Sequence, residues 1–167
     1  DVYEPGSTFK IVTASAALEE GVLKPTDVIE LGPGFLKYPG GRIVRDDHPM
    51  KRATFEDVLV HSSNVGAIKA GARVGAERLG LYIRRFGFGE RLAPDFKGES
   101  RGVVFDPAKL DESALASVSM GYQISVTPLQ MAAATSAVAN GGLLVEPHLV
   151  RATITDGVRQ AFEPKVL

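Results

Sequence analysis

Two groups of polar residues have spacings that suit acyl transfer. In the first, Ser7 and Lys10 stand three positions apart, so on a helix they share one face and the amine can reach the hydroxyl. A helix N-terminus and a partly desolvated amine would favour a serine nucleophile with lysine as its base. Ser-x-x-Lys also arises by chance, and Ser7 equally suits an ordinary helix cap, so the pair alone leaves both interpretations open.

The second group is Ser62-Ser63-Asn64, which the sequence places between two predicted helices. It supplies two hydroxyls and a carboxamide that both donates and accepts hydrogen bonds. Such a turn can face a cleft and bind a substrate. The alternative is that these residues only cap the following helix.

A helix must present Ser7 and Lys10 together. Apolar positions after Pro5-Gly6 predict one from about Ser7 to Glu20, ended by Gly21. Its alanines suit a crowded core. Glu19 and Glu20 sit where the helix dipole disfavours anions, so we expect water to solvate them.

Further helices are expected around this one, about six in all. The predicted segments are a helix capped by Thr54 with Asp57 at its third position and ending near His61, a helical pair from Asn64 broken at Gly75, a helix opening at Asp111, and one from Thr127-Pro128 to Asn140-Gly141-Gly142.

Strands are expected to be few. Residues 22–53 are rich in Gly, Pro and Asp, and they suggest a loop with a small hairpin, with β-like pieces at 28–29 and 42–45 flanking Pro39-Gly40-Gly41. A second hairpin is predicted at about 149–162, around Thr155-Asp156-Gly157. The predicted fold class is therefore α+β and helix-dominated.

Composition narrows the function classes. With 19 basic and 20 acidic residues the net charge is −1, so no field favours a nucleic acid partner. Cysteine is absent, which excludes a disulfide framework or a thiolate site. His48, His61 and His148 show no metal-ligand spacing and are assigned to loops or helix ends. We expect no metal and no cofactor.

One uncharged stretch, residues 113–145, raises the question of a membrane span. Pro128, Gln130, Asn140 and other polar residues interrupt it, so a buried helical pair is favoured. The chain starts at Asp1 without an initiator methionine, and we expect it to be a piece of a longer protein.

Several stretches, in order along the chain, resemble penicillin-binding transpeptidases. Tyr3–Lys10 looks like the first active-site motif of this family and Ser62–Gly66 like the second. Similar stretches follow at Gly87-Phe88-Gly89, Gly98-Glu99, Gly121-Tyr122, Val126–Gln130 and Asn140-Gly141-Gly142. The details resemble the class B branch, nearest its cell-division members.

The resemblance implies a role for each matching residue. Ser7 would be acylated, Lys10 would take its proton, and Ser62 would relay a proton to the leaving amine. Asn64, with Ser63, would bind the substrate, and the Ser7 N–H would form half of an oxyanion hole. The implied substrates are peptidoglycan stem peptides ending in D-alanyl-D-alanine, with β-lactams as inhibitors.

The family's third motif is missing, because no lysine is followed by Thr-Gly or Ser-Gly. We therefore expect residues 1–167 to be one incomplete transpeptidase domain, with a helical lobe over about 1–142 and the hairpin at about 149–162. Most of the central antiparallel sheet of the serine β-lactamase and transpeptidase fold would be absent, which would leave an apolar face exposed. The isolated chain is expected to be inactive.

The resemblance also implies a setting. The parent protein would work on the outer side of the bacterial cytoplasmic membrane, held by an N-terminal helix outside this chain. Its partners would be the rest of its own domain and division or cell-wall proteins. After Leu167 we predict Lys-Thr-Gly or Lys-Ser-Gly and a strand.

Rival functions share parts of the pattern. A serine β-lactamase commonly needs Glu-x-x-x-Asn after the second motif, and the only asparagines are Asn64 and Asn140. A penicillin-sensing domain stays open, as does a non-catalytic lobe that binds protein partners.

Overall fold

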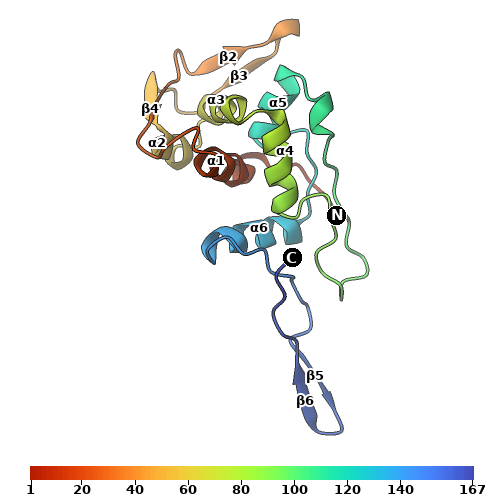
Figure 1. Cartoon of the computed structure of the whole chain (residues 1–167). Coiled ribbons are helices and arrows are strands. Elements are labelled where there is room, and N and C mark those ends of the chain that lie inside the picture. The colour runs from red at the N-terminus through yellow and green to blue at the C-terminus, as the bar shows by residue number, and fades with distance from the viewer.

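Helix α1 lies at the centre of the structure, with α3 above it and α6 below it in Figure 1. This computed structural model describes all residues, 1–167. The α-helices are α1 (Lys10–Glu19), α2 (Phe55–Val60), α3 (Asn64–Val74), α4 (Ala76–Arg85), α5 (Glu112–Ser119) and α6 (Pro128–Ala139). Short 3₁₀ helices are η1 (Gly6–Phe9), η2 (Pro39–Gly41) and η3 (Pro107–Lys109). The prediction of a helix-dominated α+β chain is confirmed.

The core is built around α1. Phe9, Val12, Ala16 and Ala17 are fully buried, and the rings of Phe9 and Phe88 lie 5.3 Å apart. Alanine side chains let α3 and α4 pack closely on α1. Each large apolar side chain buried in this way contributes about 1.5–3 kcal/mol to stability, which holds α1 rigidly in place.

The residues that lead into α1 pack against the segment around Gly121. The predicted helix is present, but its first turn is the 3₁₀ helix η1, in which Gly6 has a φ of +56°. The Gly6 N–H donates a hydrogen bond of 2.9 Å to the Gly121 carbonyl. A Cβ on Gly121 would come within 2.1 Å of the Gly6 carbonyl oxygen, so only glycine allows this approach.

The predicted helix starts are confirmed. Thr54 and Asp57 form a reciprocal capping box at α2, and Thr127 forms one with Gln130 at α6. The Asp111 side chain accepts from the Ala114 N–H at the start of α5. These caps satisfy backbone N–H groups that a helix N-terminus leaves without partners, so the starts are strongly specified.

Strands occur only as three antiparallel pairs: β1 (Val28–Glu30) with β4 (Arg52–Thr54), β2 (Phe35–Lys37) with β3 (Ile43–Arg45), and β5 (Ala152–Thr155) with β6 (Val158–Ala161). The predicted C-terminal hairpin is confirmed. The sequence predicts that pieces at 28–29 and 42–45 flank Pro39-Gly40-Gly41 in a small hairpin, yet residues 28–30 pair with residues 52–54, with Val28 opposite Thr54. The hairpin itself joins β2 and β3, because η2 turns the chain tightly at Gly40 and Gly41.

Glu19 is exposed, as expected, but Glu20 has partners within the protein. Its Oε2 lies 2.5 Å from Arg78 Nη1, and its Oε1 accepts a 3.0 Å hydrogen bond from the Tyr82 hydroxyl. Both partners are on α4, which packs against α1. An anion that the α1 dipole disfavours is thus stabilised by a cation and a hydroxyl from a neighbouring helix.

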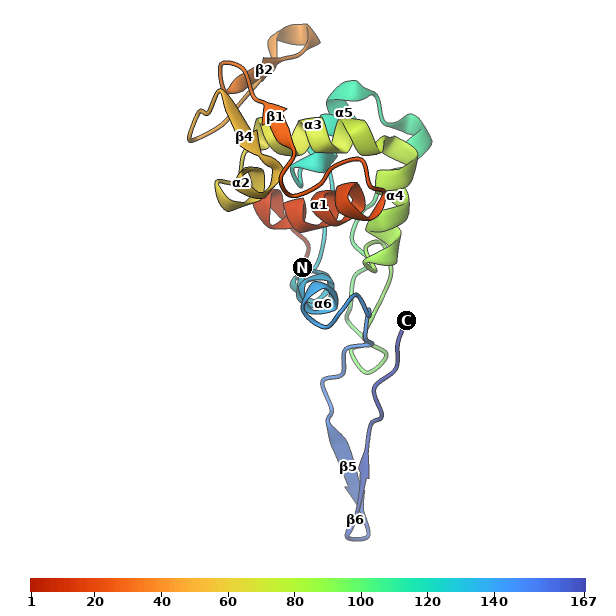
Figure 2. The ribbon, with the colours of Figure 1, turned by 60° about the vertical axis from the view of Figure 1, so that its left-hand side comes forward.

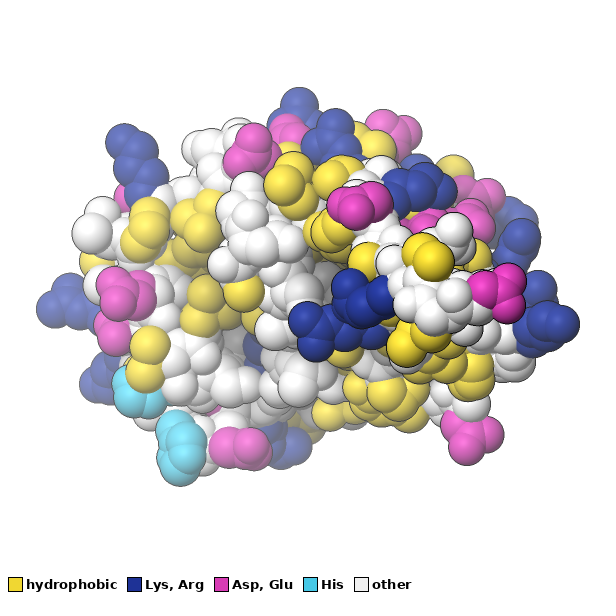
Figure 3. Space-filling view, turned by 90° about the horizontal axis from the view of Figure 1, so that it is seen from below, with side chains coloured by type: hydrophobic (Ala, Val, Ile, Leu, Met, Phe, Trp, Pro, Cys, Tyr) yellow, Lys and Arg dark blue, Asp and Glu magenta, His cyan; other side chains and the backbone are white.

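The uncharged stretch forms two helices, α5 and α6, but not the buried pair that the sequence favours, because Ala132, Thr135 and Val138 leave one side of α6 exposed. Neither these helices nor any other in the structure is long and apolar enough to cross a bilayer. Figure 2 shows the β5–β6 hairpin extending away from the helices. Figure 3 looks at that end of the molecule, where apolar side chains lie interspersed with charged ones.

Candidate active site

The amine of Lys10 is the meeting point of the predicted site residues. Its Nζ lies 3.1 Å from Ser7 Oγ and 3.0 Å from Ser62 Oγ. It also lies 2.6 Å from the Ser62 carbonyl oxygen and 2.8 Å from Asn64 Oδ1. Residues more than fifty positions apart in the chain therefore converge on one nitrogen.

Each of these side chains is held by a defined element. Ser7 lies in η1 and Lys10 is the first residue of α1, so the helical path places the amine beside the hydroxyl. Ser62 lies in the turn between α2 and α3 with a φ of +52°, a left-handed conformation that is unusual for serine. That conformation accompanies the approach of both its hydroxyl and its carbonyl to Lys10.

The turn is narrow because α2 and α3 approach closely. A Cβ on Gly66 would lie 2.5 Å from a methyl carbon of Val58, so the glycine after Asn64 in the second motif permits this packing. Ser7 and Ser62 are exposed, while Lys10 is 3% exposed. Two exposed serines thus flank a buried lysine.

The donors and acceptors around Lys10 suit a neutral amine. The Ser62 carbonyl and Asn64 Oδ1 can only accept, whereas the two hydroxyls can either donate or accept. A neutral amine can donate to both carbonyl-type oxygens and keep its lone pair for a hydroxyl proton. Burial lowers the pKa of Lys10 from its usual 10.5 to about 8, against the opposing charges of Asp46 and Asp47. The arrangement can therefore deprotonate a serine near neutral pH.

Asn64 is fixed from two sides. Its Oδ1 faces Lys10, and its Nδ2 donates a 2.8 Å hydrogen bond to the Arg45 carbonyl at the end of β3. Its carboxamide is only partly exposed. In this geometry Asn64 orients the lysine and lies beside the exposed hydroxyls.

Ser63 differs from its neighbours. The family resemblance implies that Ser63 binds substrate with Asn64, yet Ser63 is 2% exposed and its hydroxyl is engaged within the protein. That hydroxyl donates to Asp46 Oδ2 at 2.8 Å and accepts from the Gly66 N–H at 2.9 Å. Its position fits the cap of α3 rather than a contact with a bound molecule.

Two residues important to this geometry were given no role from the sequence. Asp46 is buried beneath the Ser62-Ser63-Asn64 turn, although in Arg45-Asp46-Asp47-His48 it looks like any loop carboxylate. Gly121 belongs to a stretch that resembles the family, but nothing in that stretch reveals its contact with Gly6. Both roles depend on contacts between distant segments.

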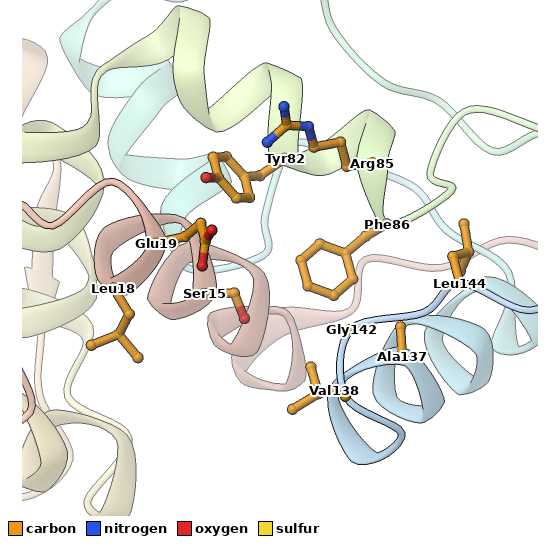
Figure 4. Close-up of a pocket in the computed structure, with 11 residues that line it drawn as sticks. Ser15, Leu18, Glu19, Tyr82, Arg85, Phe86, Ala137, Val138, Gly142 and Leu144 are labelled. Carbon is orange, nitrogen blue, oxygen red and sulfur yellow. The ribbon is translucent and has the colours of Figure 1, made fainter. Parts of the chain in front are cut away.

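A hollow of about 520 Å³ opens elsewhere on the molecule, between α1, α4 and α6 (Figure 4). The apolar part of its lining includes Leu18, Phe86, Val138 and Leu144. None of the predicted site residues lines it. We therefore assign it no part in the chemistry.

The three histidines lie in loops or at a helix end, as predicted. His148 has its Nε2 3.3 Å from Glu146 Oε1 and its ring stacked on Phe162. This contact lies at the base of the β5–β6 hairpin, away from Lys10.

Comparison with known proteins identifies relatives of the whole chain. The family model described as "Penicillin binding protein transpeptidase domain" matches residues 1–167. The chain is 40% identical over 154 residues to penicillin-binding protein PbpB of Mycolicibacterium smegmatis, covering 91% of this chain and 24% of that protein. It is 38% identical over 152 residues to stage V sporulation protein D of Bacillus subtilis, covering 89% and 23%.

A solved structure agrees with the fold. Penicillin-binding protein 3 of Mycobacterium tuberculosis, crystallised with ampicillin, superposes with a TM-score of 0.89 at 36% identity, covering 99% of this chain and 37% of that one. The chain thus spans about a quarter of the length of the curated relatives it matches. With the motif order, the Lys10-centred geometry and the match over its full length, this chain belongs to the penicillin-binding protein transpeptidase domain family.

Proposed function

We propose that the protein containing this chain is a peptidoglycan D,D-transpeptidase that is acylated on Ser7. The observation that carries the proposal is the position of the Lys10 amine within hydrogen-bonding distance of both the Ser7 and Ser62 hydroxyls. Membership of the family supports the reaction class. The ampicillin complex of a relative supports β-lactams as inhibitors of the same site.

In the first half of the proposed reaction, neutral Lys10 takes the Ser7 hydroxyl proton as Oγ attacks the carbonyl carbon of a D-alanyl-D-alanine stem peptide. An ester forms between Ser7 and the penultimate residue, and the C–N bond to the terminal D-alanine breaks. Ser62, hydrogen-bonded to Lys10, passes the proton to the leaving amine. The Ser7 N–H contributes half of the oxyanion hole.

In the second half, an amine from a neighbouring strand attacks the ester. Its proton returns through Lys10 to Ser7 Oγ, and a new amide cross-links the two peptides. A β-lactam enters by the first half, because opening its ring forms the same Ser7 ester, and the ester then persists. Asn64 lies beside Lys10 and orients the bound amide by hydrogen bonding.

The proposal includes the setting of the whole protein. The whole protein would belong to class B and act in cell division. It would work on the outer side of the cytoplasmic membrane, where peptidoglycan lies, and be anchored there by a helix outside this chain. Its domain is completed by segments that carry the Lys-Thr-Gly or Lys-Ser-Gly strand. Division or cell-wall proteins are its proposed partners.

Labelling with a fluorescent penicillin tests the proposal. In the complete protein we expect stoichiometric label on wild type and none on Ser7→Ala, with circular dichroism unchanged. Ser15→Ala is the matched control, because it removes a hydroxyl from α1, which continues η1, without touching Lys10. Label on Ser7→Ala equal to that of Ser15→Ala would show that another residue is acylated and would refute the proposal, and no label on the wild type would favour a non-catalytic interaction lobe.

A further inference from the structure

Asp46 is a buried carboxylate whose two oxygens both bind the turn that carries Ser62 and Asn64. It directly follows β3 and is 6% exposed. Its Oδ2 accepts from the Ser63 hydroxyl at 2.8 Å, and its Oδ1 accepts from the Val65 N–H at 2.9 Å. No cation lies within ion-pairing distance of it. Burying an unpaired carboxylate is costly, so its hydrogen bonds to this turn must offset that cost.

Arg45 and Asp46, at the end of β3, therefore hold the Ser62-Ser63-Asn64 turn through three hydrogen bonds. The Arg45 carbonyl accepts from Asn64 Nδ2, and the Asp46 carboxylate accepts from the residues on either side of Asn64. The β2–β3 hairpin is itself anchored to α5, since Arg42 Nη1 donates to the carbonyl and the hydroxyl of Ser113 at 2.9 and 2.8 Å. Figure 1 shows β3 lying over α3. The turn has few alternative positions while these bonds persist.

Asp46 also acts on Lys10 through its charge. Burial lowers the pKa of Lys10, and two negative charges oppose that change, Asp46 more strongly than Asp47. Asp47 is exposed and makes no side-chain hydrogen bond to the turn. The other ionisable groups that flank the site residues in the sequence are Glu4, Arg45, His48 and His61, all of them exposed. Asp46 is thus the one buried charge beside the lysine.

We propose that Asp46 is a positioning residue for acyl transfer, whose carboxylate holds the turn carrying Ser62 and Asn64 at hydrogen-bonding distance from Lys10. The inference rests on the proposed function, because it gives Asp46 a part in the same reaction. It touches no substrate atom. Its effect passes through Ser63 and the start of α3 to the residues that face Lys10.

The experiment measures the rate of acylation by a fluorescent penicillin against pH in the complete protein. Asp46→Asn keeps the shape of the side chain but removes its charge, so the bond to the Val65 N–H becomes a weaker neutral one and an amide N–H takes the place of the acceptor for the Ser63 hydroxyl. We expect the plateau rate to fall by about tenfold to a hundredfold, as small misplacements of catalytic groups do. The midpoint of the pH profile should move to lower pH, because a negative charge that favours protonated Lys10 is gone.

Two further variants distinguish the effect of Asp46 on the position of the turn from the effect of its charge on Lys10. Ser63→Ala removes the hydroxyl that Asp46 holds but leaves the charge, so the plateau rate should fall while the midpoint stays at the wild-type pH. Asp47→Asn removes an exposed charge with no bond to the turn, so its plateau should stay within about twofold of wild type.

Several outcomes would overturn the inference. If Asp46→Asn is less stable but keeps the wild-type plateau and midpoint, the carboxylate only stabilises the fold. If Asp46→Asn does not fold, Ser63→Ala decides, and a wild-type plateau in that variant removes the positioning role. Absence of label on the wild-type protein itself would instead refute the proposed function, so the two failures are distinguishable.

Discussion

Lys10 differs from a surface lysine in two ways: its side chain is buried, and its amine is surrounded by more hydrogen-bond acceptors than it has protons to donate. Its Nζ is within hydrogen-bonding distance of four oxygens, while an ammonium has only three protons to donate. A neutral amine satisfies the two carbonyl-type acceptors and still accepts a proton from a hydroxyl. The same residue therefore serves as the structural link between α1 and the Ser62 turn and as the candidate base.

This environment predicts the pH dependence of acylation. Lys10 accepts a proton only when neutral, and its pKa is about 8, so the acylation rate should rise about tenfold per pH unit below that value and level off above it. With an ordinary lysine the rise would continue beyond about pH 10. The measurement is the penicillin acylation rate of the complete protein from about pH 6 to about pH 10.

Lys10→Arg provides the control for that profile. A guanidinium stays charged throughout this range, so the variant should show no label at any of these pH values. A wild-type rate that stays constant between about pH 6 and about pH 9 would contradict a base role for Lys10.

At the residue scale, the sequence predicted the reacting side chains better than the residues that hold them in position. Ser7 and Lys10 are close in sequence, and helical spacing alone brings them together. Ser62 and Asn64 were predicted by resemblance, and their approach to Lys10 depends on how α2 and α3 fold back. Asp46 was not predicted, because what distinguishes it from Asp47 is burial, which depends on contacts across the chain.

Among the elements, the contact between Gly121 and η1 fixes where α1 begins. Gly121→Ala should be much more damaging than Gly141→Ala, although both glycines have a φ of +86°. The added Cβ at 121 would meet the Gly6 carbonyl and Phe9, whereas at 141 nothing lies within 4 Å. The shared backbone strain therefore cancels in the comparison.

We expect Gly121→Ala to lose about 1–3 kcal/mol more unfolding free energy than Gly141→Ala, measured by urea denaturation. Because the clash moves the turn that carries Ser7, acylation in the complete protein should slow by about a hundredfold. Equal stability and equal rates in the two variants would show that the contact does not position Ser7.

Helix starts were predictable because a cap is a local event. Thr54, Asp111 and Thr127 each satisfy backbone groups within three residues of themselves. Strand pairing was not, since β1 pairs with a strand that lies beyond the whole β2–β3 hairpin. The contacts of Glu20 with Arg78 and Tyr82 on α4 were not predicted either, because they too join segments that are far apart in the sequence.

At the scale of the whole molecule, apolar surface remains uncovered. Leu18 and Val138 are 41% and 52% exposed at the rim of the hollow in Figure 4, on a face of the kind expected where the rest of the domain would pack. We predict that the isolated chain of 167 residues is not stably acylated by penicillin, because it contains no Lys-Thr-Gly or Lys-Ser-Gly sequence.

Adding the flanking segment that carries this motif should restore labelling of Ser7. The check is denaturing gel fluorescence of the isolated and extended chains after equal exposure to labelled penicillin. Stoichiometric, stable label on the isolated chain would sink the prediction and show that α1 and the Ser62 turn suffice.

The β5–β6 hairpin contributes little to the stability of the rest. All residues of β6 are exposed, as are three of the four in β5, and Ile154 is 72% exposed. Replacing residues 152–161 by a short Gly-Ser link should change the unfolding free energy by less than about 0.5 kcal/mol. Phe55→Ala, at a fully packed position, should cost about 3–5 kcal/mol in the same urea assay, and an equal loss in the two variants would contradict this view.

The turn at the tip of this hairpin has a practical use. Asp156 and Gly157 both have positive φ, at +51° and +79°, so the reversal of the chain is complete within two residues. The tip extends away from the helices in Figures 1 and 2. Exposed tips of this kind tolerate inserted sequence. A fluorescent tag spliced between these two residues would therefore let the protein be followed in living cells while α1 and its neighbours stay undisturbed.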